Sequence, residues 1–251
     1  METAAQWILH EDRHIVVVNK PAGLATQAPA GIPNVEGSVK EYLRQKYNKP
    51  GNVYLGVPHR LDRPVSGVLV LARQTKAARR LHEQFQQRTV EKEYWAVVSG
   101  RVEPAAGTWQ DWLRKVPGQA RVERTPTDET GARWAETSYR VLAWAEEMTW
   151  LALYPHTGRM HQLRVQTAGR GHPILGDILY GSEHAFGPDP RESPGQCIAL
   201  HARRLTLRHP FQGDFGQLWT FTAPLPSSWE VFAHLFPFSL LQEASTQQAP
   251  A

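Results

Sequence analysis

Residues 134–154, WAETSYRVLAWAEEMTWLALY, decide the fold class of this chain. The segment holds two runs rich in β-branched and aromatic residues, SYRVLAW and TWLALY, which predict two strands. Only Glu146 and Glu147 with their neighbours separate the runs, which is enough for a turn. Antiparallel strands can be joined by so short a turn, whereas parallel strands need a long crossover. The segment therefore predicts an antiparallel pair.

The rest of the chain extends this pattern. Further strands are predicted at residues 14–19, 67–72, 93–99, 202–208 and 218–222, and helices at residues 38–47, 76–88, 161–168 and 229–235. Ser38 and Glu41 form the capping box that would start the first helix, and Gly169 would end the third with a positive φ. Paired strands outnumber alternating β-α-β units, so the fold class is α+β, with a mainly antiparallel sheet flanked by helices and loops.

Composition excludes several classes of protein. The chain has 251 residues, 41% hydrophobic and 10% aromatic, enough for a sizeable core. One cysteine, Cys197, excludes an intrachain disulfide and a multi-cysteine zinc site, and is compatible with a reducing compartment such as the cytoplasm. No apolar run is long enough to span a membrane, and no secretory signal is visible. We expect a single domain over residues 1–241 and a disordered tail over residues 242–251.

Basic residues gather in three segments. The net charge is only +4, but residues 156–173 and 201–210 contain arginines and histidines without any acid, and residues 59–100 hold eight basic residues against four acidic ones. If the segments converge, they form a cationic surface suited to a phosphate backbone. Charge alone favours the simpler interpretation, in which these are ordinary solvated surfaces.

Residues 59–67, HRLDRPVSG, place a carboxylate between two arginines. Cations close to Asp62 would keep it ionised, as a nucleophile or a base requires. Pro64 stiffens this loop, and Gly67 allows the backbone to turn into the apolar strand that follows. A surface cluster of ion pairs is the competing interpretation of these residues, and from the bare residues it is favoured.

Three other stretches combine polar and aromatic residues. In TGRMHQLRVQ, residues 157–166, a helix would bring Arg164 onto the face of His161. In GHPILGDILYG, residues 171–181, three glycines indicate tight turns that Asp177 braces. In KEYWAVVSG, residues 92–100, Tyr94 could face a cleft and stack on a base, although strand tyrosines more often belong to the core. Zinc spacings, GxGxxG, a Walker loop and GxSxG are all missing from the sequence.

Together and in this order, these stretches resemble the RNA pseudouridine synthases. The chain is most similar to the RluA-type subfamily, which modifies large-subunit ribosomal RNA and some tRNAs. The VVVNKPAGL stretch before the motifs and LHARRLTLRHP after them extend the resemblance from about residue 15 to residue 226. It implies a pseudouridine synthase fold with an RNA-binding cleft across the sheet, and a cytoplasmic RNA-modifying isomerase that takes part in rRNA or tRNA processing.

The resemblance also implies roles for individual residues. Asp62 matches the catalytic aspartate, Tyr94 the tyrosine that stacks on the target base, and Arg164 the arginine that pairs with the aspartate. Leu163 is a candidate for the apolar wall around the base, and Arg60 matches the arginine that accompanies base flipping. The residues expected to contact RNA beside Arg60 are His59, Arg63, Arg159 and His161.

Two departures from the family pattern stand out. The catalytic domain would begin within some 15 residues, so we expect no N-terminal S4-like RNA-binding domain. Gln166 stands where relatives usually have histidine, which places local RNA contacts in question.

The implied reaction needs neither cofactor nor metal. The N1–C1′ bond of a flipped uridine breaks, the uracil turns, and C5 bonds to C1′ without redox chemistry. Asp62 would either attack C1′ or remove the 2′ proton. We expect an RNA stem-loop as the partner, no obligatory protein partner, a monomer and no membrane. A non-catalytic RNA-binding protein or RNA chaperone is the alternative, and a glycosidic hydrolase would need a second carboxylate, for which Asp177 is a doubtful candidate.

Overall fold

The computed structural model describes residues 3–187, 197–211 and 217–236. These residues form two compact units. Unit 1 consists of residues 3–91 and 202–225 without the segment 212–216, and unit 2 of residues 92–201 without the segment 188–196, together with residues 226–236. The predicted single domain over residues 1–241 stays a prediction, and the tail predicted over residues 242–251 lies outside the described residues.

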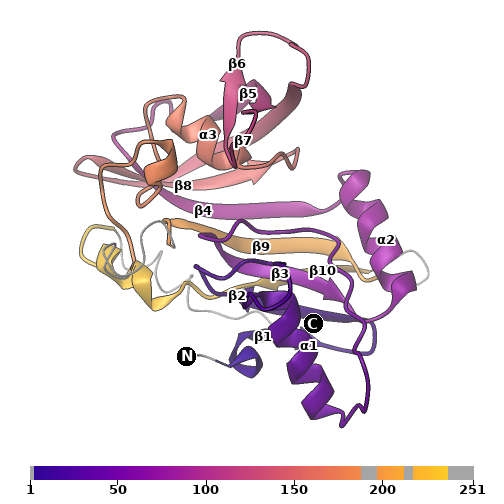
Figure 1. The fold of residues 1–251 in the computed structure, drawn as a ribbon. Coiled ribbons are helices and arrows are strands. Elements are labelled where there is room, and N and C mark those ends of the chain that lie inside the picture. Colours follow the sequence, from indigo (N-terminus) through magenta and orange to yellow (C-terminus); the bar gives the residue numbers. More distant parts are fainter. Residues whose placement is uncertain (1–2, 188–196, 212–216, 237–251) are drawn as a thin grey trace. The chain divides into compact units, whose positions relative to one another are not determined.

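Unit 1 is a mainly antiparallel sheet with two helices (Figure 1). Its strands follow the order β1 (Ile8–Glu11), β2 (Ile15–Lys20), β3 (Ser66–Ala72), β9 (Leu200–Arg208), β10 (Leu218–Thr222). A short 3-10 helix, η1 (Ala4–Trp7), precedes β1. The helices are α1 (Val35–Lys46) and α2 (Thr75–Gln86). α2 places Ala77 and Leu81 against a core built from β2, β3, β9 and β10. β3 is buried along its whole length, as its continuously apolar sequence predicts.

Helix α1 begins earlier than the sequence predicted. Asn34 is its N-cap, and the Asn34 side chain accepts a hydrogen bond from the Gly37 backbone N–H. The predicted capping box of Ser38 and Glu41 is therefore wrong, because Ser38 already lies inside the helix and donates its hydroxyl to the Asn34 carbonyl. An asparagine cap followed by an apolar residue is an equally good start signal, and it satisfies the same unpaired N–H groups.

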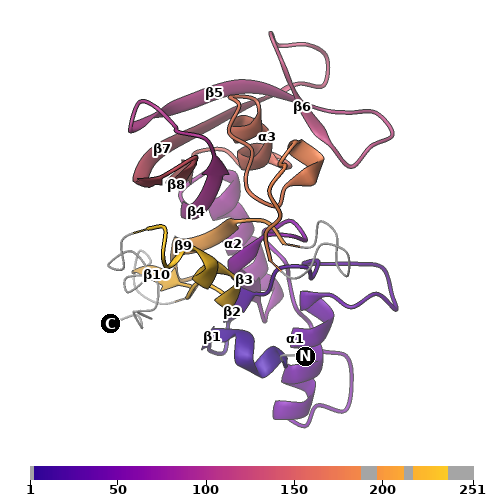
Figure 2. The same ribbon diagram turned by 90° about the vertical axis from the view of Figure 1, so that its left-hand side faces the viewer.

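Unit 2 consists of antiparallel strands and one short helix. Its strands follow the order β4 (Glu91–Ser99), β8 (Met148–Pro155), β7 (Arg133–Ala145), β5 (Ala106–Lys115), β6 (Val122–Thr125). The hairpin predicted from residues 134–154 is confirmed as β7 and β8. Helix α3 (Gln162–Ala168) packs against β5 and β6 (Figure 2). Two 3-10 turns complete the unit, η2 (Ile178–Tyr180) and η3 (Ser227–Phe232), the latter where an α-helix over residues 229–235 was predicted.

Two glycines show how local backbone geometry serves the sheets. Gly67 has a φ of +114°, and a Cβ there would lie 2.2 Å from the carbonyl oxygen of Ala202, so only glycine fits. Gly169 ends α3 as predicted: it is the C-cap, with a φ of −67°, and the positive φ belongs to Gly171 two residues later. The α+β class with a mainly antiparallel sheet is confirmed. The predicted cleft across the sheet stays a prediction.

Asp12 ties the first turn of unit 1 together. Its carboxylate accepts hydrogen bonds from the backbone N–H groups of His14 and Ile15 at 2.6 and 2.8 Å, and lies 2.8 Å from Nε2 of His209. Burial opposes ionisation, but the hydrogen bonds from His10, Ile15 and His14 outweigh it and hold the Asp12 pKa well below its usual value. A carboxylate with a lowered pKa stabilises the fold at neutral pH and loses that contribution as the pH falls.

We expect Asp12→Asn to lower the free energy of unfolding by roughly 1–3 kcal/mol at pH 7, because the charged acceptor is lost. The deficit should shrink as the pH falls below about 4, where wild-type Asp12 itself begins to be protonated on unfolding. Urea unfolding at pH 7, 5, 4 and 3.5 measures this, with exposed Asp128→Asn as the control. A deficit that stays constant down to pH 3.5 would contradict this role.

Candidate active site

Four of the expected site residues lie on one loop of unit 1. The loop precedes β3 and carries His59, Arg60, Asp62 and Arg63, with Leu61 buried between them. Arg60 and Arg63 are exposed, and Asp62 is half-buried. The Asp62 carbonyl accepts a hydrogen bond from the Val65 N–H at 3.1 Å, which closes a turn after the carboxylate. The loop therefore presents one carboxylate and two arginines from an ordered backbone.

Both ends of this loop are held by hydrogen bonds. Thr26, itself buried, donates its hydroxyl to the Leu61 carbonyl at 2.9 Å and accepts the Leu61 N–H at 3.2 Å. Arg63 donates from Nε to the Gly23 carbonyl at 2.9 Å, and the Gly23 N–H returns a bond of the same length to the Arg63 carbonyl. These reciprocal pairs leave little freedom around Asp62, which suits a catalytic group that must be preorganised.

His59 lies within the fold of unit 1. Its Nε2 accepts the Val70 backbone N–H at 3.0 Å, and its ring stacks on Phe85 with centroids 4.4 Å apart. These contacts support a role in positioning the loop. The RNA contact expected for His59 stays a prediction.

Lys20 is a residue of this region that the sequence analysis missed. It is fully buried at the end of β2, and its ammonium group donates to the carbonyls of Pro21, Leu24 and Arg63 at 2.8, 2.6 and 3.2 Å. One cation thus joins the turn after β2 to the Asp62 loop. The quoted VVVNKPAGL stretch contained the signal, because a lysine that directly follows an apolar strand run and precedes a proline turn is placed to bind turn carbonyls.

We expect Lys20→Met to lower the free energy of unfolding by roughly 2–4 kcal/mol, because the side-chain volume is kept while three buried carbonyls lose their donor. Chemical denaturation measures the loss. The control is Lys40→Met, which removes an exposed ion pair on α1 and should cost less than about 1 kcal/mol. Equal stability of Lys20→Met and wild type would show that the ammonium does not hold the loop.

The other expected site residues belong to unit 2. Tyr94 lies half-buried on β4, opposite Leu153 of β8. Leu163 and Arg164 lie on α3 and are 7% and 5% exposed. Arg159 and His161 precede α3, and His161 is its N-cap, with a φ of +51°. The structure brings together the residues around α3, whereas the Asp62 loop belongs to the other unit.

Arg164 forms a buried ion pair with Asp177. Its Nε lies 2.6 Å from one carboxylate oxygen of Asp177 and its Nη2 lies 2.7 Å from the other. Asp177 is 1% exposed. Parallel hydrogen bonds of this kind fix the plane of a guanidinium as well as its position. The prediction that Asp177 braces its loop was therefore incomplete, because its carboxylate holds an expected active-site arginine.

Tyr180 connects Arg164 to His161. Its hydroxyl lies 2.9 Å from His161 Nδ1 and accepts the Val122 N–H at 3.0 Å, while its ring centre lies 5.1 Å from the Arg164 guanidinium carbon. Burial raises the pKa of Tyr180, so the phenol stays neutral and able to donate at physiological pH. The shared face expected for His161 and Arg164 is thus occupied by Tyr180.

Arg159 also makes an internal contact. It donates from Nε to the Trp134 carbonyl at 2.9 Å, and its backbone N–H donates to the side chain of Gln162 at 3.0 Å. Arg159 is only half-buried. The RNA contacts expected for Arg159 and His161 stay predictions.

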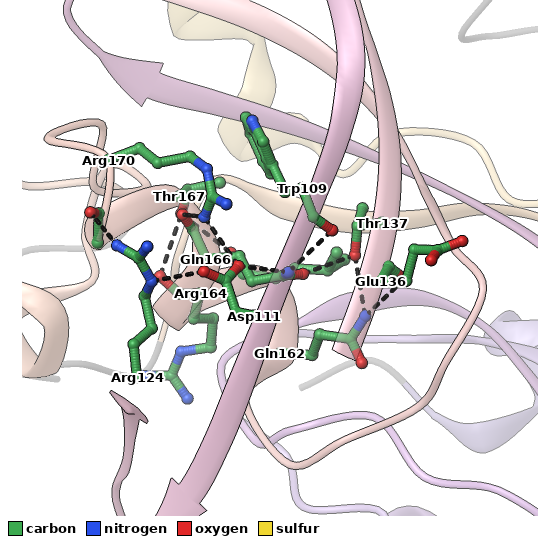
Figure 3. A network of polar contacts seen from close by, with 12 residues as sticks. Trp109, Asp111, Arg124, Glu136, Thr137, Gln162, Arg164, Gln166, Thr167 and Arg170 are labelled. Atoms are coloured by element: carbon green, nitrogen blue, oxygen red, sulfur yellow. Dashed lines mark hydrogen bonds and ion pairs between the residues drawn. The ribbon is translucent and has the colours of Figure 1, made fainter. Parts of the chain in front are cut away.

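Gln166 is an interior residue of unit 2. It is fully buried; its amide nitrogen donates to Asp111 at 2.8 Å, and its oxygen accepts from Thr137 at 2.7 Å (Figure 3). Gln162, one turn earlier, bonds to Thr137 as well, at 2.9 Å. The two glutamines therefore attach α3 to β7. The glutamine that replaces the usual histidine at position 166 therefore belongs to this interior network. Because Gln166 is fully buried, its side chain is not exposed at the protein surface.

Among residues 3–187, 197–211 and 217–236, no group of three histidine, cysteine or acidic side chains is placed to hold a metal ion. No helix within the same residues is long and apolar enough to cross a membrane.

Comparison with known proteins identifies the family. The family model described as RNA pseudouridylate synthase matches residues 14–169. The chain belongs to the RNA pseudouridylate synthase family. It is 39% identical over 223 residues to the dual-specificity RNA pseudouridine synthase RluA of Escherichia coli, covering 86% of this chain and 92% of that protein.

Other relatives agree with this assignment. The ribosomal large subunit pseudouridine synthase C of Buchnera aphidicola is 32% identical over 207 residues, covering 82% of this chain and 64% of that protein. The solved structure of human RNA pseudouridylate synthase domain containing 4 has a TM-score of 0.74 and 25% identity, covering 99% of this chain and 96% of that one. The protein is therefore an RluA-type enzyme that isomerises uridine to pseudouridine in RNA.

Proposed function

We propose that the protein converts specific uridines of structured ribosomal or transfer RNA to pseudouridine with Asp62 as the catalytic residue. The single observation that carries this assignment is the Asp62 loop. Reciprocal hydrogen bonds at Leu61 and Arg63 hold one half-buried carboxylate between two exposed arginines. The loop lies within the stretch that the family model matches.

The proposed chemistry begins with a flipped uridine. Extrusion from the RNA costs a few kcal/mol of stacking and pairing, which binding must offset. Exposed Arg60 would fill the space that the base leaves, while Arg63 would contact phosphate. Asp62 then acts at the ribose, by attack on C1′ or removal of the 2′ proton. The N1–C1′ bond breaks and the uracil turns. C5 then bonds to C1′, and the C5 proton leaves while N1 gains a proton.

Tyr94 and Leu163 would hold the uracil while it turns. A tyrosine ring offers a flat surface for stacking, and its hydroxyl could accept the C5 proton in the last step. Leu163 would close the apolar side of the base site. His59, Arg159 and His161 would support RNA binding by placing the segments that carry Arg60 and Arg164.

Arg164 would keep Asp62 ionised, and Asp177 would position Arg164. A carboxylate that loses water around it needs a nearby cation to stay charged. The bidentate ion pair fixes the guanidinium plane, so Asp177 acts through Arg164 and is a positioning residue. This role goes beyond the loop brace that the sequence suggested.

We further propose that the enzyme works in the cytoplasm, as a monomer and without an obligatory protein partner. The names of two relatives, a dual-specificity RNA pseudouridine synthase and a ribosomal large subunit pseudouridine synthase, support an RNA substrate of this kind. No element of the proposed chemistry calls for a cofactor.

Incubation of purified protein with ribosomal RNA and tRNA that carry 5-³H-uridine tests the proposal, because pseudouridine formation releases the label from C5. We expect stoichiometric release at one or a few sites. RNA binding without tritium release from any RNA would favour the non-catalytic RNA-binding alternative.

A further inference from the structure

A second feature of unit 2 lies between β6 and α3. It is a pocket of about 300 Å³ with Val122, Val165 and Ala168 in its lining. Val122 and Val165 belong to a small buried cluster, and Ala168 packs against it. Arg121 and Arg124 line the same pocket. The pocket therefore combines an apolar floor with two guanidinium groups.

Arg124 is held in place by two hydrogen bonds. Its Nε donates to Asp111 at 2.7 Å, and its Nη1 donates to the Gly169 carbonyl. Asp111, whose side chain is 3% exposed, also accepts from Arg170 at 2.9 Å and from Gln166 at 2.8 Å (Figure 3). The single negative charge of Asp111 is therefore shared by two arginines, so these three side chains carry a net charge of +1 beside the pocket.

The pocket's own acidic residue is already engaged. Glu123 pairs with Arg114 at 2.8 Å. Arg121 is exposed, with its guanidinium carbon 5.8 Å from the centre of the Tyr180 ring. An anion that enters the pocket would meet Arg121 and Arg124. Asp111 is paired with Arg124 and Arg170, and Glu123 shares Arg114 with Glu129.

We propose that this pocket binds a nucleotide of the substrate RNA outside the reacting uridine, a role that rests on the proposed function. A nucleotide combines a flat base or ribose, suited to the apolar floor, with a phosphate that guanidinium groups bind strongly. Arg121 and Arg124 contact the phosphate, and Asp111 with Gln166 keeps Arg124 in place. The buried network that includes the unusual Gln166 thereby serves RNA binding indirectly.

Two variants test the pocket from its two sides. Arg121→Ser removes an exposed phosphate contact, and Ala168→Leu fills the floor without removing a charge. The control is Arg140→Ser, which removes an exposed arginine far from the pocket. Arg140 lies opposite Ala106 at one end of β5, whereas β6 pairs with residues 112–115 at the other end. At the rise of a β-strand, these two ends of β5 are roughly 20 Å apart.

We expect both pocket variants to raise KM for the RNA about fivefold, with kcat within about twofold of wild type and the control unchanged. In a binding assay at several salt concentrations, Arg121→Ser should also lower the salt slope by about one. Unchanged KM and affinity in both variants, with wild type active, would overturn the pocket assignment and leave the isomerase activity standing. If wild type were inactive, the proposed function would fail, and the affinity assay, which needs no turnover, would still decide the pocket.

Discussion

Asp62→Asn is expected to abolish pseudouridine formation, with a loss of at least about 10³-fold, because the amide can neither attack C1′ nor remove the 2′ proton. RNA affinity should stay within about threefold of wild type, since Arg60 and Arg63 remain exposed on the same loop. Tritium release from labelled RNA gives the rate, and fluorescence anisotropy gives the affinity.

The matched control is Asp128→Asn, which removes an exposed carboxylate from a turn of unit 2. It should leave both readouts unchanged. Activity of Asp62→Asn within tenfold of wild type would exclude Asp62 as the catalytic residue. If Asp62→Asn instead lost RNA affinity and no longer unfolded in a cooperative transition, the carboxylate would be needed to hold the loop.

Asp177→Asn is expected to lower kcat roughly 100-fold and the free energy of unfolding by about 3 kcal/mol. Removing one partner of a buried ion pair is strongly destabilising, because the remaining charge, here on Arg164 at 5% exposure, loses a buried counterion. A misplaced guanidinium would also stabilise the ionised form of Asp62 less well. Single-turnover kinetics with saturating enzyme separates this loss from any change in RNA binding.

A double-mutant cycle with Arg164→Met distinguishes positioning from general destabilisation. If Asp177 acts through Arg164, adding Asp177→Asn to Arg164→Met should lower kcat by less than about threefold further, because interacting residues are not additive. Asp177→Glu should recover part of the activity, since the charge is restored. Losses of kcat that multiply in the double variant would contradict the positioning role.

The sequence predicted seven of the ten strands among the described residues, because these carry a strong local signal, and it missed β1, β5 and β6. Residues 134–154 contain two apolar runs around a charged turn, and they form β7 and β8 with that turn between them. The wholly apolar residues 67–72 are likewise buried as β3. The first helix was misplaced at its start, since Asn34 and Ser38 are both acceptable caps and only the packing of Val35 and Val39 selects the earlier one.

The sequence offers the candidate site residues, but it does not reveal the side chains that hold them in place. Asp62 and Arg164 stand in recognisable motifs, whereas several hydrogen bonds that hold the surrounding segments join distant positions. Lys20 reaches the Arg63 carbonyl across 43 residues of sequence, and Asp111 reaches Gln166 across 55. No periodicity or spacing reveals such pairs, because long-range hydrogen bonds depend on the register of the sheets. The burial of Gln166 could not be predicted either, because glutamine is usually a surface residue.

The central claim is that this chain makes pseudouridine through Asp62, and a transcriptome-wide pseudouridine map tests it most directly. Cells that lack the protein are complemented with wild type or with Asp62→Asn at equal expression. We expect one or a few uridines in ribosomal or transfer RNA to lose the modification and to regain it with wild type alone. No changed site, or equal restoration by Asp62→Asn, would contradict the claim.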